Sequence, residues 1–170
     1  MKKLVLPALL ALTLAACSST GPETAGTSVE DRGAGVATVT AGSASGSGIA
    51  ALTDPNNILS KRSVFFDFDS YVIKQEARAL VEAHARFLVQ NPQMRMLIQG
   101  NTDERGSREY NLALGQKRAD VVKQALMLLG AKEAQIESVS LGEEKPRCED
   151  RTEDCYAENR RGDMLYTGEF

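Results

Sequence analysis

The sequence contains one histidine and only three cysteines among its 170 residues. A transition-metal site needs several ligands of these types, so a metal centre is not expected. A Ser/His/Asp or Cys/His catalytic group is not expected either, because His84 falls on an apolar helical face and should be buried. The sequence therefore predicts no metal, no cofactor and no histidine-based catalysis.

The sequence also lacks an excess of basic residues. Its 20 Lys and Arg are set against 23 Asp and Glu, the formal net charge is -3, and the two signs are interspersed. Nucleic-acid-binding domains instead gather Lys and Arg on one face. A nucleic-acid partner is therefore not expected.

The conspicuous apolar run, from Leu4 to Ala16, is too short to cross a bilayer comfortably. It follows two lysines, which is typical of a secretory signal peptide over residues 1–16. Leu14-Ala15-Ala16-Cys17 resembles the lipobox of bacterial lipoproteins, in which cleavage precedes a cysteine that is then acylated. The alternative is a free thiol beyond an ordinary cleavage site. In the sorting rule of the lipoproteins that this segment resembles, an aspartate after the cysteine retains the protein in the inner membrane, so the resemblance together with Ser18 implies the outer membrane.

Large apolar side chains are scarce from Ser18 to about Asn57, where Gly, Ser, Ala and Thr dominate. Such a segment cannot bury enough surface to offset the entropy lost on ordering. We therefore expect a lipidated N-terminus and disordered tether over residues 17–57. The remaining residues, 58–170, are long enough for one domain with its own core.

This domain alternates strand and helix patterns. Apolar residues alternate over Ser63–Phe68 and at Met94, Met96 and Ile98, and they recur at helical spacing in between. Asp69-Ser70 is expected to cap the first helix, which Asn91-Pro92 ends. Further strands are expected around residues 136–141 and 162–166. The predicted fold is an α/β (α+β) two-layer sandwich of order βαβαββ, with both helices on one face of a mixed sheet.

The second helix is expected over Ser107–Leu129, with Gly130 as its C-terminal stop. Gly115 and Ala119 are small, so the helix should lie close to the sheet. The residues expected on its apolar face are Leu112, Gly115, Ala119, Val122, Leu126 and Leu129.

Cys148 and Cys155 flank the polar stretch EDRTED. In an oxidising compartment this spacing suits a short disulfide loop, and two free thiols are the alternative.

Three stretches carry a family resemblance: FFDFDSYVI from Phe65, NTDERGSREYNLALGQKRADVV from Asn101, and ENRR from Glu158. They resemble the peptidoglycan-binding C-terminal domain of OmpA-like proteins, and the lipobox and tether extend the resemblance over essentially the whole chain. The family motif is Thr-Asp, ten residues, Leu-Ser, two residues, Arg-Ala, two residues, Val, three residues, Leu. Here it is met by Thr102-Asp103, Leu114, Arg118-Ala119, Val122 and Leu126, with Gly115 in place of serine.

The resemblance implies that Asp103 and Arg118 bind meso-diaminopimelate, the zwitterionic end of the peptidoglycan stem peptide. An amino-acid head pairs an ammonium with a carboxylate, which an acceptor anion and a bidentate arginine fork would match. Asp103 would take the ammonium and Arg118 the carboxylate. The alternative is a simple salt bridge between these two residues.

The resemblance also brings Phe68, Asp69 and Thr102 to the ligand, although Asp69 could equally be a helix cap and Phe68 a core residue. Asn101 stands where the family commonly has histidine, so any contact that needs a ring nitrogen is in doubt. Arg105 and Asn111 lie beside the pocket and are expected to be solvated polar residues, and the alternative is that they hold the turn or contact the stem peptide.

The implied function is that of an outer-membrane lipoprotein that binds peptidoglycan non-covalently. It would tether the membrane to the cell wall as part of the Tol system, in envelope integrity and cell division, with TolB and other Tol proteins as partners. One alternative is a periplasmic cell-wall hydrolase using Asp67, Asp69 or Asp103, although a nearby arginine should keep Asp103 ionised. The other alternative is a purely protein-interaction module.

Overall fold

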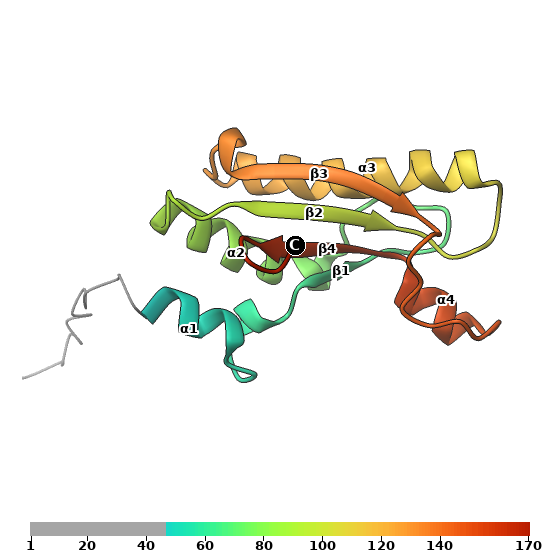
Figure 1. Cartoon of the computed structure of the whole chain (residues 1–170), viewed down its shortest axis with the longest axis horizontal. Helices are drawn as coiled ribbons and strands as arrows, with labels where there is room; N and C mark the ends of the chain where they lie inside the picture. Colours follow the sequence, from blue (N-terminus) through green and yellow to red (C-terminus); the bar gives the residue numbers. More distant parts are fainter. Residues whose placement is uncertain (1–46) are drawn as a thin grey trace, which may run out of the picture. The chain divides into compact units, whose positions relative to one another are not determined.

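The computed structural model describes residues 47–170 (Figure 1). Side chains are described from residue 49. The expected signal peptide, Cys17 and most of the expected tether lie outside the described residues. The described elements, in chain order, are α1 (Ser47–Thr53), η1 (Ile58–Ser60), β1 (Ser63–Phe65), η2 (Gln75–Ala77), α2 (Arg78–Gln90), β2 (Met96–Asn101), α3 (Arg108–Leu128), η3 (Glu133–Gln135), β3 (Ile136–Gly142), α4 (Glu153–Asn159) and β4 (Arg161–Tyr166).

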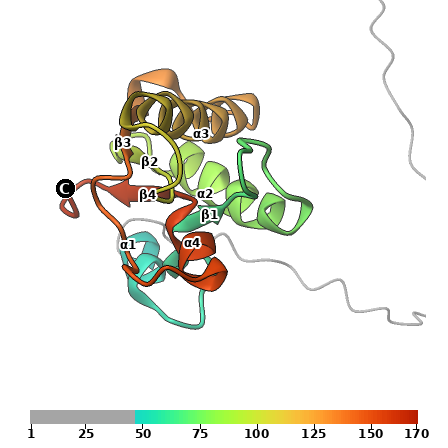
Figure 2. The same cartoon turned by 90° about the vertical axis from the view of Figure 1, so that its right-hand side faces the viewer.

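The strands form one four-stranded mixed sheet in the order β1-β4-β2-β3. β4 pairs antiparallel with both β1 and β2, whereas β2 and β3 are parallel. The crossover between the parallel pair is α3, and α2 and α3 lie on the same face of the sheet (Figures 1 and 2). The predicted two-layer α/β fold with helices on one face is confirmed.

The core lies between this helical layer and the sheet. Met96 and Ile98 on β2 alternate with less buried neighbours, as the period of a strand requires. The largest fully buried apolar side chains are Val64, Phe66, Leu88, Met96, Ile98, Val122, Leu126, Ile136, Met164 and Tyr166.

The first helix begins later than predicted. α2 starts at Arg78, after Ala77, and the expected cap at Asp69-Ser70 is wrong. Asp69 has a φ of 52°, which is incompatible with the extended backbone of an N-cap residue. The expected strand also stops at Phe65, so the side chain of Phe68 is 58% exposed instead of lying in the core.

α3 begins as predicted, with the Ser107 hydroxyl accepting from the Tyr110 amide. Leu112 and Leu129, however, are exposed, so the buried face of α3 carries Asn111, Leu114 and Arg118 in addition to the predicted Gly115, Ala119, Val122 and Leu126. There the expected close approach is confirmed: a β-carbon on Gly100 would lie 1.8 Å from the carbonyl oxygen of Gly115. A β-carbon on Gly115 would lie 2.3 Å from Ser140 Oγ, which gives a steric reason for glycine in place of the family's serine.

Two of the described α-helices, α1 and α4, were not predicted. α1 lies inside the segment expected to be a tether, and its Leu52 is buried in the core cluster. The tether boundary at residue 57 is therefore too late. α4 begins at Glu153, after the N-cap residue Thr152, whose hydroxyl accepts from the Cys155 amide. The acidic Glu153 and Asp154 in its first turn are the local signal for a helix start.

His84 is buried as predicted, and its hydrogen bonds fix its tautomer. Nε2 lies 2.9 Å from the carbonyl oxygen of Lys61, which can only accept, so Nε2 carries the proton. Nδ1 then accepts from the Tyr166 hydroxyl at 2.8 Å. Burial lowers the pKa of His84 from 6.5 to about 4, so the folded protein holds the neutral ring.

We expect the free energy of unfolding to fall with acidification through this histidine. The unfolded chain takes up a proton below its pKa of 6.5, whereas the folded chain does so only near 4, so stability is lost as the pH falls through that window. The loss should be about 1 kcal/mol between about pH 7.5 and about pH 5.5. His84→Gln keeps a donor and an acceptor without a titrating ring, so urea unfolding of this variant should show a flatter pH dependence. Equal slopes for both proteins would contradict the assignment.

Candidate functional site

A cavity of about 190 Å³ opens where three segments meet. They are the loop after β1, the turn after β2 and the N-terminal half of α3. Arg160, just before β4, closes one side. The lining residues are Phe68, Asp69, Thr102, Asp103, Arg105, Gly106, Tyr110, Asn111, Leu114, Arg118 and Arg160.

Arg118 is the buried cation of this cavity, with 0% of the residue exposed. Its Nε, Nη1 and Nη2 donate to the carbonyl oxygens of Ser70, Asn101 and Asp67 at 2.8, 2.9 and 3.1 Å. A guanidinium has five N–H donors, so one on each Nη is left over. Burial lowers the pKa of Arg118 to about 10, which leaves it charged at neutral pH.

No carboxylate oxygen among residues 47–170 forms a salt bridge with Arg118, although Asp103 lines the same cavity. The alternative of a direct Asp103–Arg118 salt bridge is therefore not what the structure contains. A buried charge without a counter-ion is costly. The two unused donors make this part of the cavity suited to an anionic group.

Asp103 is already saturated with donors. Its Oδ1 accepts from the amide and Nε of Arg105, and its Oδ2 accepts from Arg105 Nη2 at 2.7 Å and Arg160 Nη1 at 3.1 Å. These four bonds match the acceptor capacity of a carboxylate. Burial raises the pKa of Asp103, but the bonds from Arg105 and Arg160 outweigh it and bring the pKa below its ordinary value. Arg105 and Arg160, rather than Arg118, are thus the cations bonded to it.

Asp69 is the freer carboxylate at the cavity. Within the described part of the chain, the Tyr110 hydroxyl is the one side chain that donates to it, so most of its acceptor capacity remains. Its left-handed backbone conformation, φ 52°, is one that Asp and Asn tolerate better than other non-glycine residues. Phe68, next to it, stacks under the Arg105 guanidinium at 4.2 Å.

Of the two adjacent residues Asn101 and Thr102, only Thr102 lines the cavity. Asn101 does not line the cavity: its Nδ2 bonds the carbonyl oxygen of Gln99, and its own carbonyl holds Arg118. Thr102 is buried and lines the cavity, and its Oγ1 has no hydrogen-bond partner within residues 47–170.

Arg105 and Asn111 are not the solvated residues that were predicted. Arg105 donates hydrogen bonds to both carboxylate oxygens of Asp103. Asn111 is buried and donates to Glu143. Arg160 and Tyr110 were not among the predicted site residues, although each lies in a stretch that carries the resemblance, ENRR and NTDERGSREYNLALGQKRADVV. Only the fold brings Arg160 to Asp103 and Tyr110 to Asp69.

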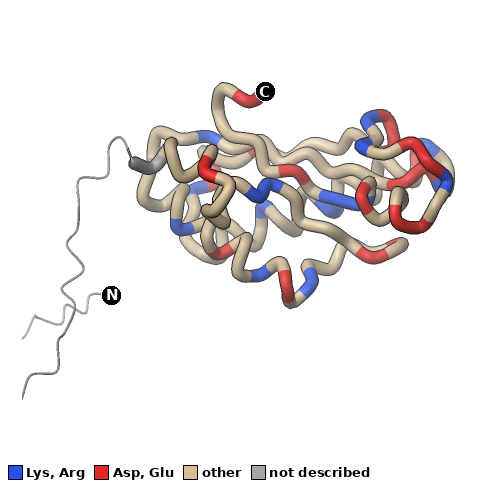
Figure 3. The backbone as a smooth tube through the Cα atoms, turned by 90° about the horizontal axis from the view of Figure 1, so that it is seen from below, with Lys and Arg blue, Asp and Glu red and all other residues tan. Residues whose placement is uncertain are grey.

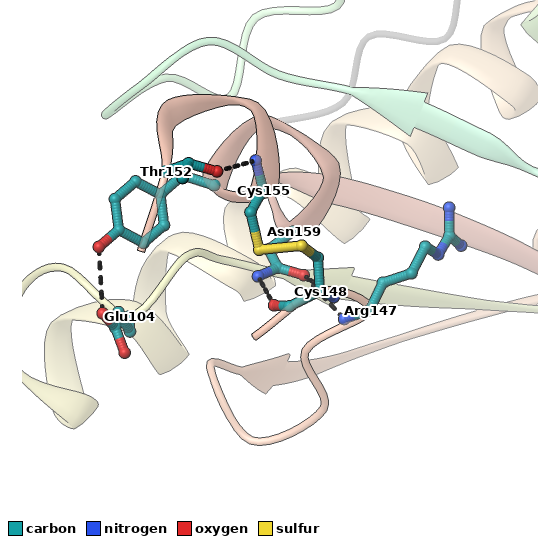
Figure 4. The surroundings of a disulfide bond; sticks show 7 residues. Glu104, Arg147, Cys148, Thr152, Cys155 and Asn159 are labelled. Atoms are coloured by element: carbon teal, nitrogen blue, oxygen red, sulfur yellow. Dashed lines mark hydrogen bonds between the residues drawn. A yellow bond between two sulfur atoms is a disulfide. The ribbon is translucent and has the colours of Figure 1, made fainter. Parts of the chain in front are cut away.

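Cys148 and Cys155 are joined by a disulfide, with their Cα atoms 5.3 Å apart (Figure 4). The bridge closes the loop that leads into α4. Acidic and basic residues are interleaved along the described chain, and both kinds crowd this end of the molecule (Figure 3).

Among the described residues, no cluster of three potential metal ligands is present. Of the helices in residues 47–170, none combines the length and the apolar character that a bilayer span needs.

Comparisons with known proteins agree on one family. The model of the OmpA family matches residues 65–160. A curated protein of Haemophilus influenzae, named peptidoglycan-associated lipoprotein, is 39% identical over 153 residues, which cover 90% of each chain. A protein of the same name from Pasteurella multocida is 46% identical over 104 residues, covering 61% of this chain and 69% of its own.

Solved structures give the same result. The crystal structure of the peptidoglycan-associated lipoprotein from Burkholderia pseudomallei matches with a TM-score of 0.67 and 57% identity, covering 68% of this chain and 98% of its own. The C-terminal domain of Helicobacter pylori MotB, at 20% identity and a TM-score of 0.58, covers 63% of this chain and 84% of its own, and shares the fold alone. The chain belongs to the OmpA family, within the group of peptidoglycan-associated lipoproteins.

Proposed function

We propose that this chain is an outer-membrane lipoprotein that binds peptidoglycan non-covalently, by gripping the zwitterionic end of diaminopimelate in the stem peptide. The observation that carries the proposal is Arg118. It is buried and charged, it lacks a salt-bridge partner among the described residues, and it lines a cavity with one unused donor on each Nη. The two oxygens of an incoming carboxylate would accept hydrogen bonds from both donors at once.

The ammonium of the same ligand needs an acceptor nearby. Asp69 has free acceptor capacity on the cavity wall, whereas the oxygens of Asp103 are occupied by Arg105 and Arg160. We therefore assign the ammonium to Asp69. Asp103 holds two arginines in place and adds negative potential, which differs from the role suggested by the sequence motif. Phe68 and Thr102 would form the walls, and Asn101 would orient Arg118 through its carbonyl.

The anchor and the partners belong to the same proposal. A signal peptide over residues 1–16 would be removed, Cys17 acylated, and residues beyond it would act as a tether to the folded domain. The curated relatives carry the name peptidoglycan-associated lipoprotein, which supports an envelope role. We extend this role to the Tol–Pal system, with TolB and other Tol proteins as partners in envelope integrity and cell division.

Catalysis fits the site less well than recognition. A glycosidase needs one carboxyl that stays protonated near neutral pH. The hydrogen bonds from Arg105 and Arg160 lower the pKa of Asp103, so it cannot serve as that acid. A module that binds only proteins would give no reason for a buried Arg118 without a salt-bridge partner among the described residues.

The proposal is tested by titrating the full chain, in detergent, with two muropeptides. One carries diaminopimelate and the other carries lysine, which lacks the distal carboxylate. We expect calorimetry to show at least about 30-fold weaker binding of the lysine form, because the buried charge of Arg118 would then have no carboxylate to pair with. Equal affinities for both would contradict the site assignment, and no binding of either would contradict the function.

The anchor has its own test. Cys17→Ser removes the thiol that acylation needs, and the several acyl chains expected there would each add about 0.8 kcal/mol per buried methylene. We expect the variant to leave the outer-membrane fraction and appear among soluble periplasmic proteins on cell fractionation. A variant that stays with the membrane after the cell wall has been digested would overturn the lipidation assignment.

A further inference from the structure

Helix α4 and its disulfide stand beside the cavity and fix one another. The Asn159 Oδ1 accepts from the amides of Arg147 and Cys148 at 2.7 and 3.1 Å, and its Nδ2 donates to the Cys148 carbonyl at 2.7 Å (Figure 4). The Cys148–Cys155 bond closes the same loop covalently. The loop entrance and the helix are therefore held together at two points.

This helix reaches the cavity through Arg105. On α4, Glu153 Oε2 accepts from Arg105 Nη1 at 3.2 Å, and the Tyr156 ring lies 4.4 Å from the guanidinium carbon. Phe68 also packs against the guanidinium, at 4.2 Å, so two rings contact it. Contacts of an arginine with aromatic rings are favourable and directional. Arg105 is thereby held between α4 and the cavity wall.

Arg160, which follows α4 directly, completes the connection. It donates to Glu153 Oε1 at 2.8 Å and to Asp103 Oδ2 at 3.1 Å. The carboxylate of Glu153 thus touches both arginines that saturate Asp103. The described core cluster, in contrast, contains no residue of α4. Disturbing α4 should therefore affect the cavity before it affects the core.

We propose that the disulfide-closed α4 is a positioning element of the ligand cavity. Tyr156 and Glu153 hold Arg105 against Asp103 and Phe68, and opening the Cys148–Cys155 bond loosens this arrangement and weakens ligand binding. The inference rests on the proposed zwitterion site. It adds the disulfide, Glu153 and Tyr156 to the residues that determine its affinity.

Opening the bond has a defined chemistry. A dithiol reductant attacks one sulfur as a thiolate, forms a mixed disulfide and then closes on itself. The protein gains two electrons and two protons as two thiols, and the reductant leaves as its cyclic disulfide. Cys148 lines a surface groove of about 420 Å³, whereas Cys155 is 3% exposed, so the reagent has its access from the Cys148 side.

The test compares variants of the full chain in detergent, titrated with the diaminopimelate muropeptide. We expect Cys148→Ser/Cys155→Ser and Tyr156→Ala each to weaken binding roughly three- to ten-fold. Tyr156→Phe keeps the ring and should recover most of the affinity. When either the double-serine change or Tyr156→Ala is combined with Arg105→Ala in a double-mutant cycle, the combined loss of binding free energy should be clearly smaller than the sum of the two separate losses. The reason is that both changes disrupt the same contact between α4 and Arg105. Additive losses, or unchanged binding in the double-serine variant, would overturn the proposal.

A second measurement needs no ligand. The Arg105 Nε–H resonance should be displaced by ring currents in the oxidised protein and move toward that of a free arginine after dithiothreitol is added. A resonance that does not respond would refute the role of α4 even if the muropeptide binds. A resonance that responds in a protein that binds no muropeptide would leave α4 in control of Arg105 and place the failure with the proposed function.

Discussion

Arg118→Lys is expected to weaken binding of the diaminopimelate muropeptide by at least about 100-fold. Lysine keeps the positive charge but has one nitrogen with three donors. That nitrogen cannot serve the three carbonyl oxygens that hold Arg118 and also the two oxygens of a ligand carboxylate. The loss should appear in calorimetry as weaker affinity, with the diaminopimelate preference over lysine reduced at the same time.

The matched control is Arg86→Lys, which makes the same change at an exposed arginine of α2 whose partner is Glu82 on the helix surface. We expect this variant to bind like the original chain. Because Arg118 also holds three backbone carbonyl oxygens, circular dichroism should first establish that both variants are folded at the temperature of the titration. A folded Arg118→Lys chain with unaltered affinity would remove the central residue from the proposed site.

Gly100→Ala is expected to lower the free energy of unfolding by about 3 kcal/mol or more, the upper range for overpacking a rigid site. The new β-carbon would stand 1.8 Å from the Gly115 carbonyl oxygen and 3.2 Å from the Ala119 amide nitrogen. Both neighbours are backbone atoms, so no side chain can turn aside. α3 would have to lift from β2, and the packing of its buried face would be lost with it.

The matched control is Gly162→Ala in the neighbouring strand β4. Its β-carbon would meet the Phe66 ring at 3.6 Å and Val122 Cγ2 at 3.7 Å, which are ordinary contacts. Urea unfolding should therefore show a small effect for Gly162→Ala and a large one for Gly100→Ala. Similar midpoints for the two variants would mean that the close approach of α3 to the sheet does not limit stability.

Much of the fold was predictable because its signals are local. The alternation at Met96 and Ile98 indicates a strand, and Ser107 indicates the start of a helix. The small residues of α3 indicate a close contact with the sheet. Each of these signals lies within a few residues of sequence. α1 was missed because the composition around it is that of a flexible segment, and only contact with the core identifies Leu52 as buried.

The cavity was less predictable than the fold. The family motif predicted that Asp103 and Arg118 belong to one site. The spacing of residues in the sequence cannot show that Arg105 and Arg160 already occupy the acceptor positions of Asp103. Nor could it show that Asp69 has a left-handed backbone, since the tertiary contacts around the loop impose that conformation. The difference between the two carboxylates in the hydrogen bonds they accept is thus a property of the folded chain.

The three carbonyl bonds of Arg118 also have a mechanical meaning. They join α3 to the loop after β1 and to the end of β2. A pull exerted through a bound carboxylate would enter at the guanidinium and divide at once among these bonds. Because bonds loaded together share the tension, whereas bonds loaded one after another fail one at a time, the guanidinium would keep its position under such a load.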